Sequence, residues 1–584
     1  MILNLLHRVS PGETYPYFLL QQEYAHQLKL KVTLIVQLDA MHDESIVAQM
    51  KEYHREYGDE LGLSLSGFDS PEFLEKIGGH EDFIWLYSRE DKRTILQMIV
   101  DRYRKVFGGD PVSAAAYHLD ASAMQILKEI CPAIKISVAG CFEEGVKVFH
   151  GCNNSWYLFN EGMPWGPWYP AKSHTLRPAE DENDWAGMVA VPHLSRDLAL
   201  SYEGRNDFFA SHPANAQRGL ANIGYNHPYD YNLVDNYRLQ EDYNDGFSYY
   251  HVFVSPGWLA GHPTIQDPNE VSQKLYQDLL EYFVELRQQG QLTDMYMSEF
   301  ADWYQEKIPI GKPQVYLAKE LLYGSKKHYF WYIDPYCRVL IDTNQGGSIG
   351  DLRPYVGKYA CSTGPDTPAL IYGSYPYLIH SQYRSGISHH YMDGARTTLM
   401  VTHNDQTLDL GACRTRVAEV KRDATGTHTT LTPAKLTFQD GLHAEIETTY
   451  HFPGSGQILI ARKIKALSDP QAVLQVQEYL KGCYGTTEYP EDMHGIQLGV
   501  EGEKSIAFEY LYRGRVIETA NARATRARIP QINTEIRLEA VDGPALSGKA
   551  VEGILFNPYY TLTLAYSLTL GKETHTCLRL NPVQ

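Results

Sequence analysis

From Met1 to Gly324, short apolar runs alternate with longer stretches that place apolar side chains at every third or fourth position. The runs Met1–Leu6 and Val32–Val36 predict strands, and the stretches Tyr17–Leu30 and Glu44–Gly58 predict amphipathic helices. Repeated strand–helix units of this length predict parallel strands joined by right-handed crossovers. Further strands are predicted at Leu61–Leu65, Phe83–Tyr87, Ser113–Tyr117, Ile134–Ala139, Met188–Val191 and Tyr249–Val254, and further helices at Asp91–Phe107, Ala121–Ile130 and Asn269–Gln289.

About seven or eight such units favour a closed barrel over an open sheet. No GxGxxG motif follows a strand, so a dinucleotide-binding sheet lacks its main sequence mark. Beyond Gly324 the helical period fades, and short alternating strands such as Lys327–Ile333 and Glu445–His451 are separated by turn residues, a pattern typical of a β-sandwich. The sequence therefore predicts an α/β protein in which a (β/α) TIM-like barrel, residues 1–324, precedes an antiparallel β-sandwich domain, residues 325–584.

The composition adds a net charge of −19 and a large number of tyrosines, 43 in all. A surface this acidic repels phosphate backbones, so nucleic acid is not an expected partner. A tyrosine ring has an apolar face and a polar edge, which suits the C–H face and the hydroxyl rim of a sugar. The alternative is that these rings fill cores and sheet faces. Carbohydrate is the expected substrate, and the same composition permits a homodimer.

Cysteine spacing and hydropathy bear on the compartment. No pair among the 8 cysteines has CxxC spacing, so no zinc ribbon or redox motif is indicated, and free thiols suit a reducing compartment. The apolar start, Met1–Leu6, is too short for a signal peptide, and no apolar run is long enough for a transmembrane helix. We expect a bacterial cytoplasmic protein without a membrane partner, or a secreted one if a signal peptide has been removed.

In a (β/α) barrel the reacting groups stand at the carboxyl ends of the strands, so the residues after each strand are the catalytic candidates. His118 and Asp120 share a face if the strand alternation continues, and a histidine beside a carboxylate can move protons near neutral pH. Asp120 also precedes a predicted helix, so a helix cap is the alternative. Asp39 and Glu144 are candidates for the second carboxylate that glycoside hydrolysis needs. The alternative for Asp39 is a cap in its loop, and the alternative for Glu144 is a solvated turn residue.

Candidates for substrate binding carry a flat ring, a planar cation or another polar group near a strand end or loop. The segment Gly151–His174 is rich in Gly, Pro and aromatic residues, which indicates a functional loop unless its rings form a small hydrophobic core. Guanidinium groups suit a sugar carboxylate, and structural ion pairs are the alternative. The candidates are His7, Arg8, Trp165, Trp168, Tyr169, Arg205, Trp258 and Asn344. No cofactor is expected; the alternative is a catalytic metal held by His118 and Asp120 with His7 or His193.

Two segments resemble the glycoside hydrolase/deacetylase barrel superfamily, which includes NodB-like polysaccharide deacetylases, family 57 amylases and family 38 α-mannosidases. They are Leu61–Phe68, similar to the third strand of that barrel, and Phe107–Tyr117, followed by Asp120 and Leu127. The resemblance covers roughly the predicted barrel, and its motifs are short. It implies a barrel fold and action on carbohydrate.

The departures from that superfamily limit the reaction. NodB-like deacetylases present paired aspartates after the first strand and an HxxxH pair after a later strand. Here the first strand ends in His7-Arg8, and the strand comparable to the later one ends in Ser64 and Ser66 without a histidine pair. The resemblance to family 38 mannosidases rests on Asp120 alone. The plan is also similar to inverting exo-sialidases, which implies a sugar carboxylate at Arg8 and Arg205. The expected function is a glycoside hydrolase that releases a terminal sugar, including acidic sugars such as sialic acid; the alternatives are a metal-dependent carbohydrate deacetylase and a non-catalytic carbohydrate-binding protein.

Overall fold

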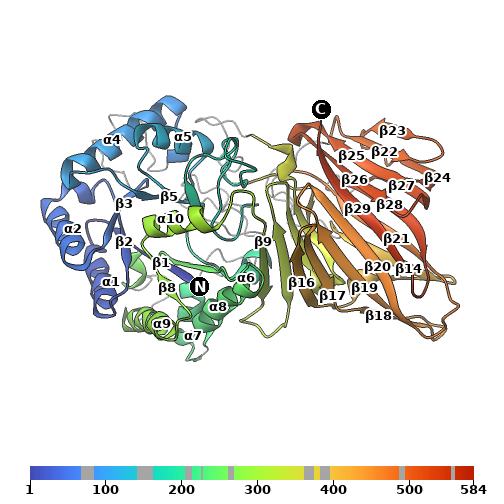
Figure 1. Ribbon diagram of the computed structural model, residues 1–584, viewed down its shortest axis with the longest axis horizontal. Coiled ribbons are helices and arrows are strands. Elements are labelled where there is room, and N and C mark those ends of the chain that lie inside the picture. Colours follow the sequence, from blue (N-terminus) through green and yellow to red (C-terminus); the bar gives the residue numbers. More distant parts are fainter. Residues whose placement is uncertain are drawn as a thin grey trace. The chain divides into compact units, whose positions relative to one another are not determined.

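A computed structural model of the chain describes residues 1–66, 84–140, 162–203, 213–224, 226, 228–260, 269–360, 374–381, 395–485, 493–553 and 559–583 (Figure 1). The chain divides into two compact units, and each is described by itself. Unit 1 comprises Met1–Lys312, Leu321–Gly324 and Ala360–Tyr375. Unit 2 comprises Pro313–Glu320, Ser325–Tyr359 and Pro376–Gln584. The chain thus passes between the units several times, and the single boundary at Gly324 stays a prediction.

Unit 1 is built on a parallel sheet of eight strands, with the order β6-β5-β4-β3-β2-β1-β7 and β8 beside β1. Its strands are nearly all apolar and buried, because helices cover such a sheet from outside while its inner face forms a core. The strands are β1 (Ile2–Val9), β2 (Val32–Val36), β3 (Glu60–Ser64), β4 (Ser113–Ala115), β5 (Ile136–Gly140), β6 (Val189–Pro192), β7 (Tyr249–Val252) and β8 (Thr293–Asp294).

The sheet is a half-barrel, and a closed TIM barrel is not what the described residues form. Its two edges are β6 and β7, and no strand ladder joins them within the described ranges. The backbone N–H of Ser195, just after β6, donates to the carbonyl of His251 in β7 at 2.9 Å, which ties the edges together. The prediction of a strand at Phe83–Tyr87 is wrong for Ile84–Leu86, because these residues form a short 3-10 helix, η2.

Helix ends in unit 1 follow the signals in the sequence. Asp43 and Ser88 accept hydrogen bonds from the first turns of α2 and α4, and Gly58 and Gly108 end these helices with φ near +81°. Only glycine adopts this left-handed conformation without steric cost. The helices are α1 (Tyr15–Gln27), α2 (Glu44–Tyr57), α4 (Arg89–Phe107), α5 (Ala121–Ile130), α6 (Leu198–Glu203), α7 (Pro213–Asn222), α8 (Tyr229–Arg238), α9 (Asn269–Gln288) and α10 (Met297–Lys307).

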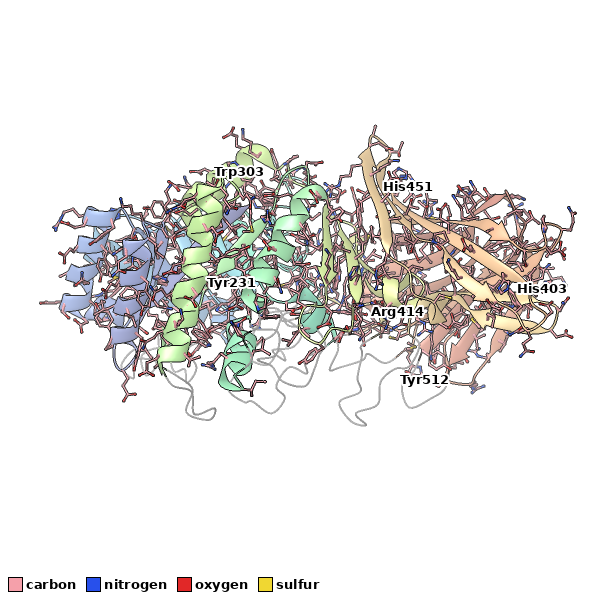
Figure 2. The ribbon with its side chains drawn as sticks, turned by 90° about the horizontal axis from the view of Figure 1, so that it is seen from below. Tyr231, Trp303, His403, Arg414, His451 and Tyr512 are labelled. Carbon is pink, nitrogen blue, oxygen red and sulfur yellow. The ribbon has the colours of Figure 1, made fainter. Side chains whose placement is uncertain are left out.

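Helix α10 closes the half-barrel at the amino ends of its strands. The backbone N–H of Met297 donates to Thr33 Oγ1 at 3.1 Å, and that of Ser298 donates to Glu60 Oε2 at 3.1 Å. Phe300 of α10 belongs to the core that fills the inner face of the sheet. Trp303, labelled in Figure 2, packs on Phe247 at 5.4 Å between ring centroids. The opposite end, where the strands finish, is left uncovered by α10; we call it the mouth.

In its described residues, unit 2 forms three antiparallel sheets. Buried and exposed residues alternate along the strands, as in β20 (Gln457–Leu467), because one face of each large sheet meets the core. The core lies between the six-stranded and ten-stranded sheets and joins Val476 and Leu568 of the former to Ile446 and Ile464 of the latter. This packing is a β-sandwich, as the sequence predicts.

The three sheets have five, six and ten strands. The five-stranded sheet contains β13 (Ile379–His380), β12 (Ser348–Arg353), β11 (Arg338–Asp342), β10 (His328–Ile333) and β9 (Gln314–Lys319). The six-stranded sheet contains, in order, β15 (Gln406–Asp409), β14 (Thr397–His403), β21 (Leu474–Gly482), β28 (Tyr559–Leu568), β27 (Ala545–Gly553) and β24 (Val516–Ala522). The ten-stranded sheet contains β16 (Val417–Asp423), β17 (Gly426–Leu431), β19 (His443–Phe452), β20, β29 (Glu573–Pro582), β26 (Thr534–Ala540), β25 (Ala524–Ile529), β22 (Gln497–Glu501) and β23 (Ile506–Glu509), with β18 (Ala434–Thr437) beside β19.

Two further features concern the helices and the cysteines of the described ranges, residues 1–66, 84–140 and onward. Within them, no helix has the length and apolar character needed to cross a membrane. The cysteines found there, Cys131, Cys337, Cys413, Cys483 and Cys577, carry free thiols.

Candidate functional site

Four side chains from four different strands meet at the mouth of the half-barrel. Arg8 projects inward from β1, and Tyr117, His193 and Phe253 follow β4, β6 and β7. Arg8 Nη2 donates to the Tyr117 hydroxyl at 2.8 Å, and its guanidinium carbon lies 5.3 Å from the ring centres of Tyr117 and Phe253. The His193 ring lies 4.9 Å from Tyr117 and 5.0 Å from Phe253. We call these four residues the mouth cluster.

The Arg8 guanidinium is the most telling group of this cluster. Within the described ranges no carboxylate lies at ion-pair distance from it, although the side chain is half-buried. The π faces of two aromatic rings stabilise the cation in place of a counter-ion. A guanidinium so placed keeps N–H donors for an anion that arrives from solvent, and its planar fork matches a carboxylate.

A second histidine lies deeper, beneath the mouth cluster. His251 is 1% exposed, and its ring is parallel to that of Phe253 at 6.4 Å. Burial lowers the pKa of His251 to about 3, so the imidazole is neutral at physiological pH. His193 is 8% exposed, and its ring packs between Tyr117 and Phe253 at the mouth.

His118 and Asp120 lie on the opposite side of the sheet from the mouth cluster. Asp120 Oδ1 accepts from the backbone N–H groups of Ser122 and Ala123, at 2.9 and 3.1 Å, and thereby caps α5. Its other oxygen lies 2.8 Å from the buried ammonium of Lys92. These are the contacts of the helix cap that the sequence offered as the alternative, so we no longer assign proton transfer to Asp120.

His118 shares this buried environment. It is 1% exposed and meets the Trp85 ring edge-on at 6.0 Å. Burial, with Lys92 nearby, lowers the pKa of His118 to about 4, although Asp120 acts against the shift. Because side chains alternate along an extended chain, Tyr117 turns inward and His118 outward. Alternation places Tyr117 and His118 on opposite faces, but it does not tell which of the two faces inward.

His7 also faces outward, although Arg8 beside it faces the mouth. Its Nδ1 lies 2.7 Å from Gln22 Oε1 of α1, and its Nε2 lies 2.6 Å from the Tyr276 hydroxyl of α9. Burial lowers the pKa of His7 to about 4. His7 therefore joins the sheet to its helices and does not bind substrate at the mouth.

The aromatic platform expected from the loop before β6 is part of a hydrophobic core. Trp165 and Trp168 are each 1% exposed, and Trp168 Nε1 donates to the Thr175 carbonyl at 2.8 Å. The Tyr169 hydroxyl donates to the Ile308 carbonyl at 2.7 Å, next to α10. These rings are too enclosed to stack on a sugar. They form the small hydrophobic core that the sequence offered as the alternative.

The remaining candidates are scattered. Asp39 is half-buried directly after β2, on the mouth side of the sheet. Trp258 is half-buried, and its Nε1 donates to Asn215 Oδ1 at 3.1 Å. Asn344 lies in unit 2, where its side-chain amide exchanges hydrogen bonds with the backbone N–H and carbonyl of His328; its role in substrate binding stays a prediction. Glu144 and Arg205 lie outside the described residues.

No group of three or more His, Cys, Asp or Glu side chains in the described part of the chain is arranged to hold a metal ion. In particular, His7, His118 and His193 do not converge, because the first two lie behind the sheet and the third lies at its mouth.

Residues 26–243 match the model of a family described as a domain of unknown function with a solved structure, DUF3863. No curated protein matches the chain.

Several solved structures resemble parts of this chain at low scores. One is a candidate glycoside hydrolase/deacetylase from Parabacteroides distasonis, 15% identical, with a TM-score of 0.48 over 64% of this chain and 88% of that one. Another is a candidate polysaccharide deacetylase from Mycobacterium smegmatis, 11% identical, with a TM-score of 0.30 over 53% and 93% of the two chains. A galactose mutarotase related enzyme from Lactobacillus acidophilus is 10% identical, with a TM-score of 0.28 over 44% and 97%. Because these scores are low, the contacts of the mouth cluster alone carry the functional argument.

Proposed function

We propose that this protein is a carbohydrate-active hydrolase that releases a terminal acidic sugar, and that Arg8 binds the carboxylate of this sugar. The observation that carries the proposal is the half-buried Arg8 guanidinium, held between two aromatic rings without a carboxylate partner in the described ranges. It stands at the carboxyl ends of parallel strands, where folds of this kind bind their substrates. A sialic or uronic acid supplies the planar anion that fits such a fork.

The other members of the mouth cluster have complementary roles in this proposal. The Tyr117 hydroxyl already accepts from Arg8 and fixes the direction of the guanidinium. The buried ring of Phe253 supports the guanidinium from the core side and so helps to hold it at the mouth. His193, the imidazole of the mouth cluster, transfers the proton to the leaving oxygen. Asp39, after the neighbouring strand β2, activates water as the second group that glycoside hydrolysis requires.

The proposal is tested with chromogenic glycosides of sialic acid, glucuronic acid, and neutral and amino sugars. We expect turnover of an acidic glycoside. Arg8→Ala should raise its KM by roughly ten- to a hundredfold, since hydrogen bonds to charged groups contribute about 1.5–3 kcal/mol. His193→Ala should lower kcat by roughly a hundredfold or more. The matched control is Arg55→Ala, because Arg55 is an exposed arginine of α2 with a surface partner, Glu56.

Three outcomes would contradict the proposal in different ways. Turnover that Arg8→Ala leaves unchanged would remove the carboxylate site. Release of acetate from acetylated glycans, dependent on added Zn²⁺, would establish the deacetylase alternative. Glycan binding without turnover of any substrate would indicate a non-catalytic carbohydrate-binding protein.

A further inference from the structure

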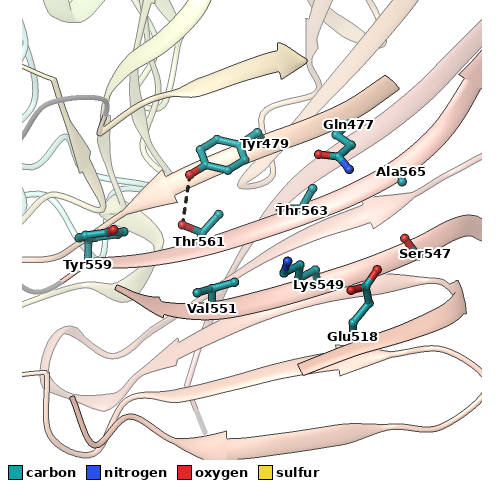
Figure 3. A pocket seen from close by; sticks show the side chains of 10 residues that line it. All are labelled: Gln477, Tyr479, Glu518, Ser547, Lys549, Val551, Tyr559, Thr561, Thr563 and Ala565. Atoms are coloured by element: carbon teal, nitrogen blue, oxygen red, sulfur yellow. Dashed lines mark hydrogen bonds between the residues drawn. The ribbon is translucent and has the colours of Figure 1, made fainter. Parts of the chain in front are cut away.

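Unit 2 carries a groove on the outer face of its six-stranded sheet, in a place that the mouth cluster does not use (Figure 3). Its volume is about 300 Å³, at the lower end of the range of small-molecule sites. Four neighbouring strands supply its lining: Gln477 and Tyr479 from β21; Tyr559, Thr561, Thr563 and Ala565 from β28; Ser547, Lys549 and Val551 from β27; and Glu518 from β24.

The groove follows from the sizes of side chains in register across the sheet. Tyr479 pairs with Thr563, Thr563 with Lys549, and Lys549 with Glu518, so these four residues form one row across four strands. The next row joins Gln477, Ala565 and Ser547. In both rows the residue on β28 is small while its neighbours on β21 are long, and adjacent strands lie only about 4.8 Å apart. A trough therefore runs along β28, with walls formed by the neighbouring strands.

Two tyrosine rings in the groove are held in place by neighbours. The Tyr479 hydroxyl lies 3.4 Å from Thr561 Oγ1, the contact drawn in Figure 3. The Tyr559 ring lies 4.1 Å from the Lys481 ammonium, which packs against one of its faces. Rings fixed before a ligand arrives lose less conformational entropy on binding. Both rings are half-buried, so part of each remains accessible to a ligand.

The polar lining narrows the chemistry of the ligand. It contains an amide, three hydroxyl groups on serine and threonine, one cation and one anion: Gln477, Ser547, Thr561, Thr563, Lys549 and Glu518. Donors and acceptors are thus mixed, and the two charges of the lining cancel. An anionic ligand would meet the Glu518 carboxylate, and an apolar ligand would bury these polar groups without partners at a cost in free energy. Aromatic rings combined with mixed hydrogen-bonding groups suit an uncharged polyhydroxylated chain.

We propose that this groove is a second carbohydrate site, which binds a neutral oligosaccharide along β28 with its pyranose rings against Tyr479 and Tyr559. The site is separate from the mouth cluster in residues and in the charge of its ligand, so it stands whether or not the half-barrel is an enzyme. It would hold a glycan chain on unit 2 independently of any reaction in unit 1.

The test is isothermal titration of the full-length protein with maltohexaose, cellohexaose, xylohexaose and mannohexaose, with oligogalacturonate as the acidic comparison. We expect at least one neutral oligosaccharide to bind at millimolar concentration or below and oligogalacturonate to bind more weakly. Tyr479→Ala and Tyr559→Ala should each weaken binding roughly three- to tenfold. Ala565→Trp should abolish it, because the new ring fills the trough while every hydrogen-bonding group remains.

Two controls separate this site from other effects. Gln475→Ala changes an exposed side chain on the same face of β21 but outside the groove, so binding should be unchanged. Arg8→Ala alters the mouth cluster and should also leave this binding unchanged, which separates the two proposals. The inference is overturned if no neutral oligosaccharide binds, if oligogalacturonate binds best, or if Ala565→Trp binds as well as the natural sequence while melting at the same temperature.

Discussion

Replacing Asp120 by alanine should destabilise the protein, because the carboxylate has two structural contacts and both are buried. One oxygen caps α5 through the backbone N–H groups of Ser122 and Ala123. The other oxygen lies 2.8 Å from the ammonium of Lys92, and the exposed fractions of the two side chains are 1% and 0%. Loss of the cap alone costs about 1 kcal/mol. Leaving the Lys92 charge buried without its partner costs about 3–5 kcal/mol more.

The total, about 4–6 kcal/mol, is comparable with the whole stability of many domains, so the variant could fail to fold. Asp120→Asn is therefore included, since asparagine caps a helix as well as aspartate does and only the charge is lost. The double variant Lys92→Met with Asp120→Asn should recover most of the stability, because no buried charge remains.

Urea unfolding followed by circular dichroism measures these differences. Asp43→Ala is the matched control, because Asp43 caps α2 in the same way but is exposed, so its loss should cost only about 1 kcal/mol. Asp120→Ala could unfold at the same urea concentration as Asp43→Ala while hydrolysis of the best glycoside falls a hundredfold. That result would refute the structural role of Asp120 and would support a catalytic role for it instead.

Two further predictions concern acid stability and a glycine. Burial holds the pKa of His118 at about 4, below its value of about 6.5 in the unfolded chain, so its contribution to stability is complete above pH 6.5 and is lost as the pH falls toward 4. Between pH 7 and 5, His118→Phe should lose about 2 kcal/mol less stability than the natural sequence, and equal losses in urea titrations at both pH values would contradict the predicted coupling. Gly346 has φ +63°, and a Cβ there would overlap the Leu410 carbonyl, so Gly346→Ala should lower the melting temperature more than Gly441→Ala, whose φ is also positive but whose surroundings are open. Equal shifts in differential scanning fluorimetry would show that the close approach to Leu410 does not matter.

The candidate site could be predicted only in part from the sequence. Strand ends were the correct place to look, and Arg8 was among the residues selected there. The sequence did not show which of two adjacent residues turns inward. In the structure Tyr117 and Arg8 face the mouth, while their neighbours His118 and His7 face outward. The aromatic segment Gly151–His174 was ambiguous for a related reason. A ring that stacks on a sugar and a ring that fills a core can have the same local sequence.

Local patterns determined the elements of this protein. Apolar runs, helical periods, and caps such as Asp43 and Gly58 act over a few residues, so their effects are present in the chain before it folds. Tertiary structure alone decided that the parallel strands form a half-barrel with β6 and β7 as its edges, that α10 closes one end, and that Arg8 has two aromatic rings and no carboxylate beside it in the described ranges. These features depend on contacts between residues far apart in the chain. Their energies are set by burial and distance, which a linear pattern does not contain.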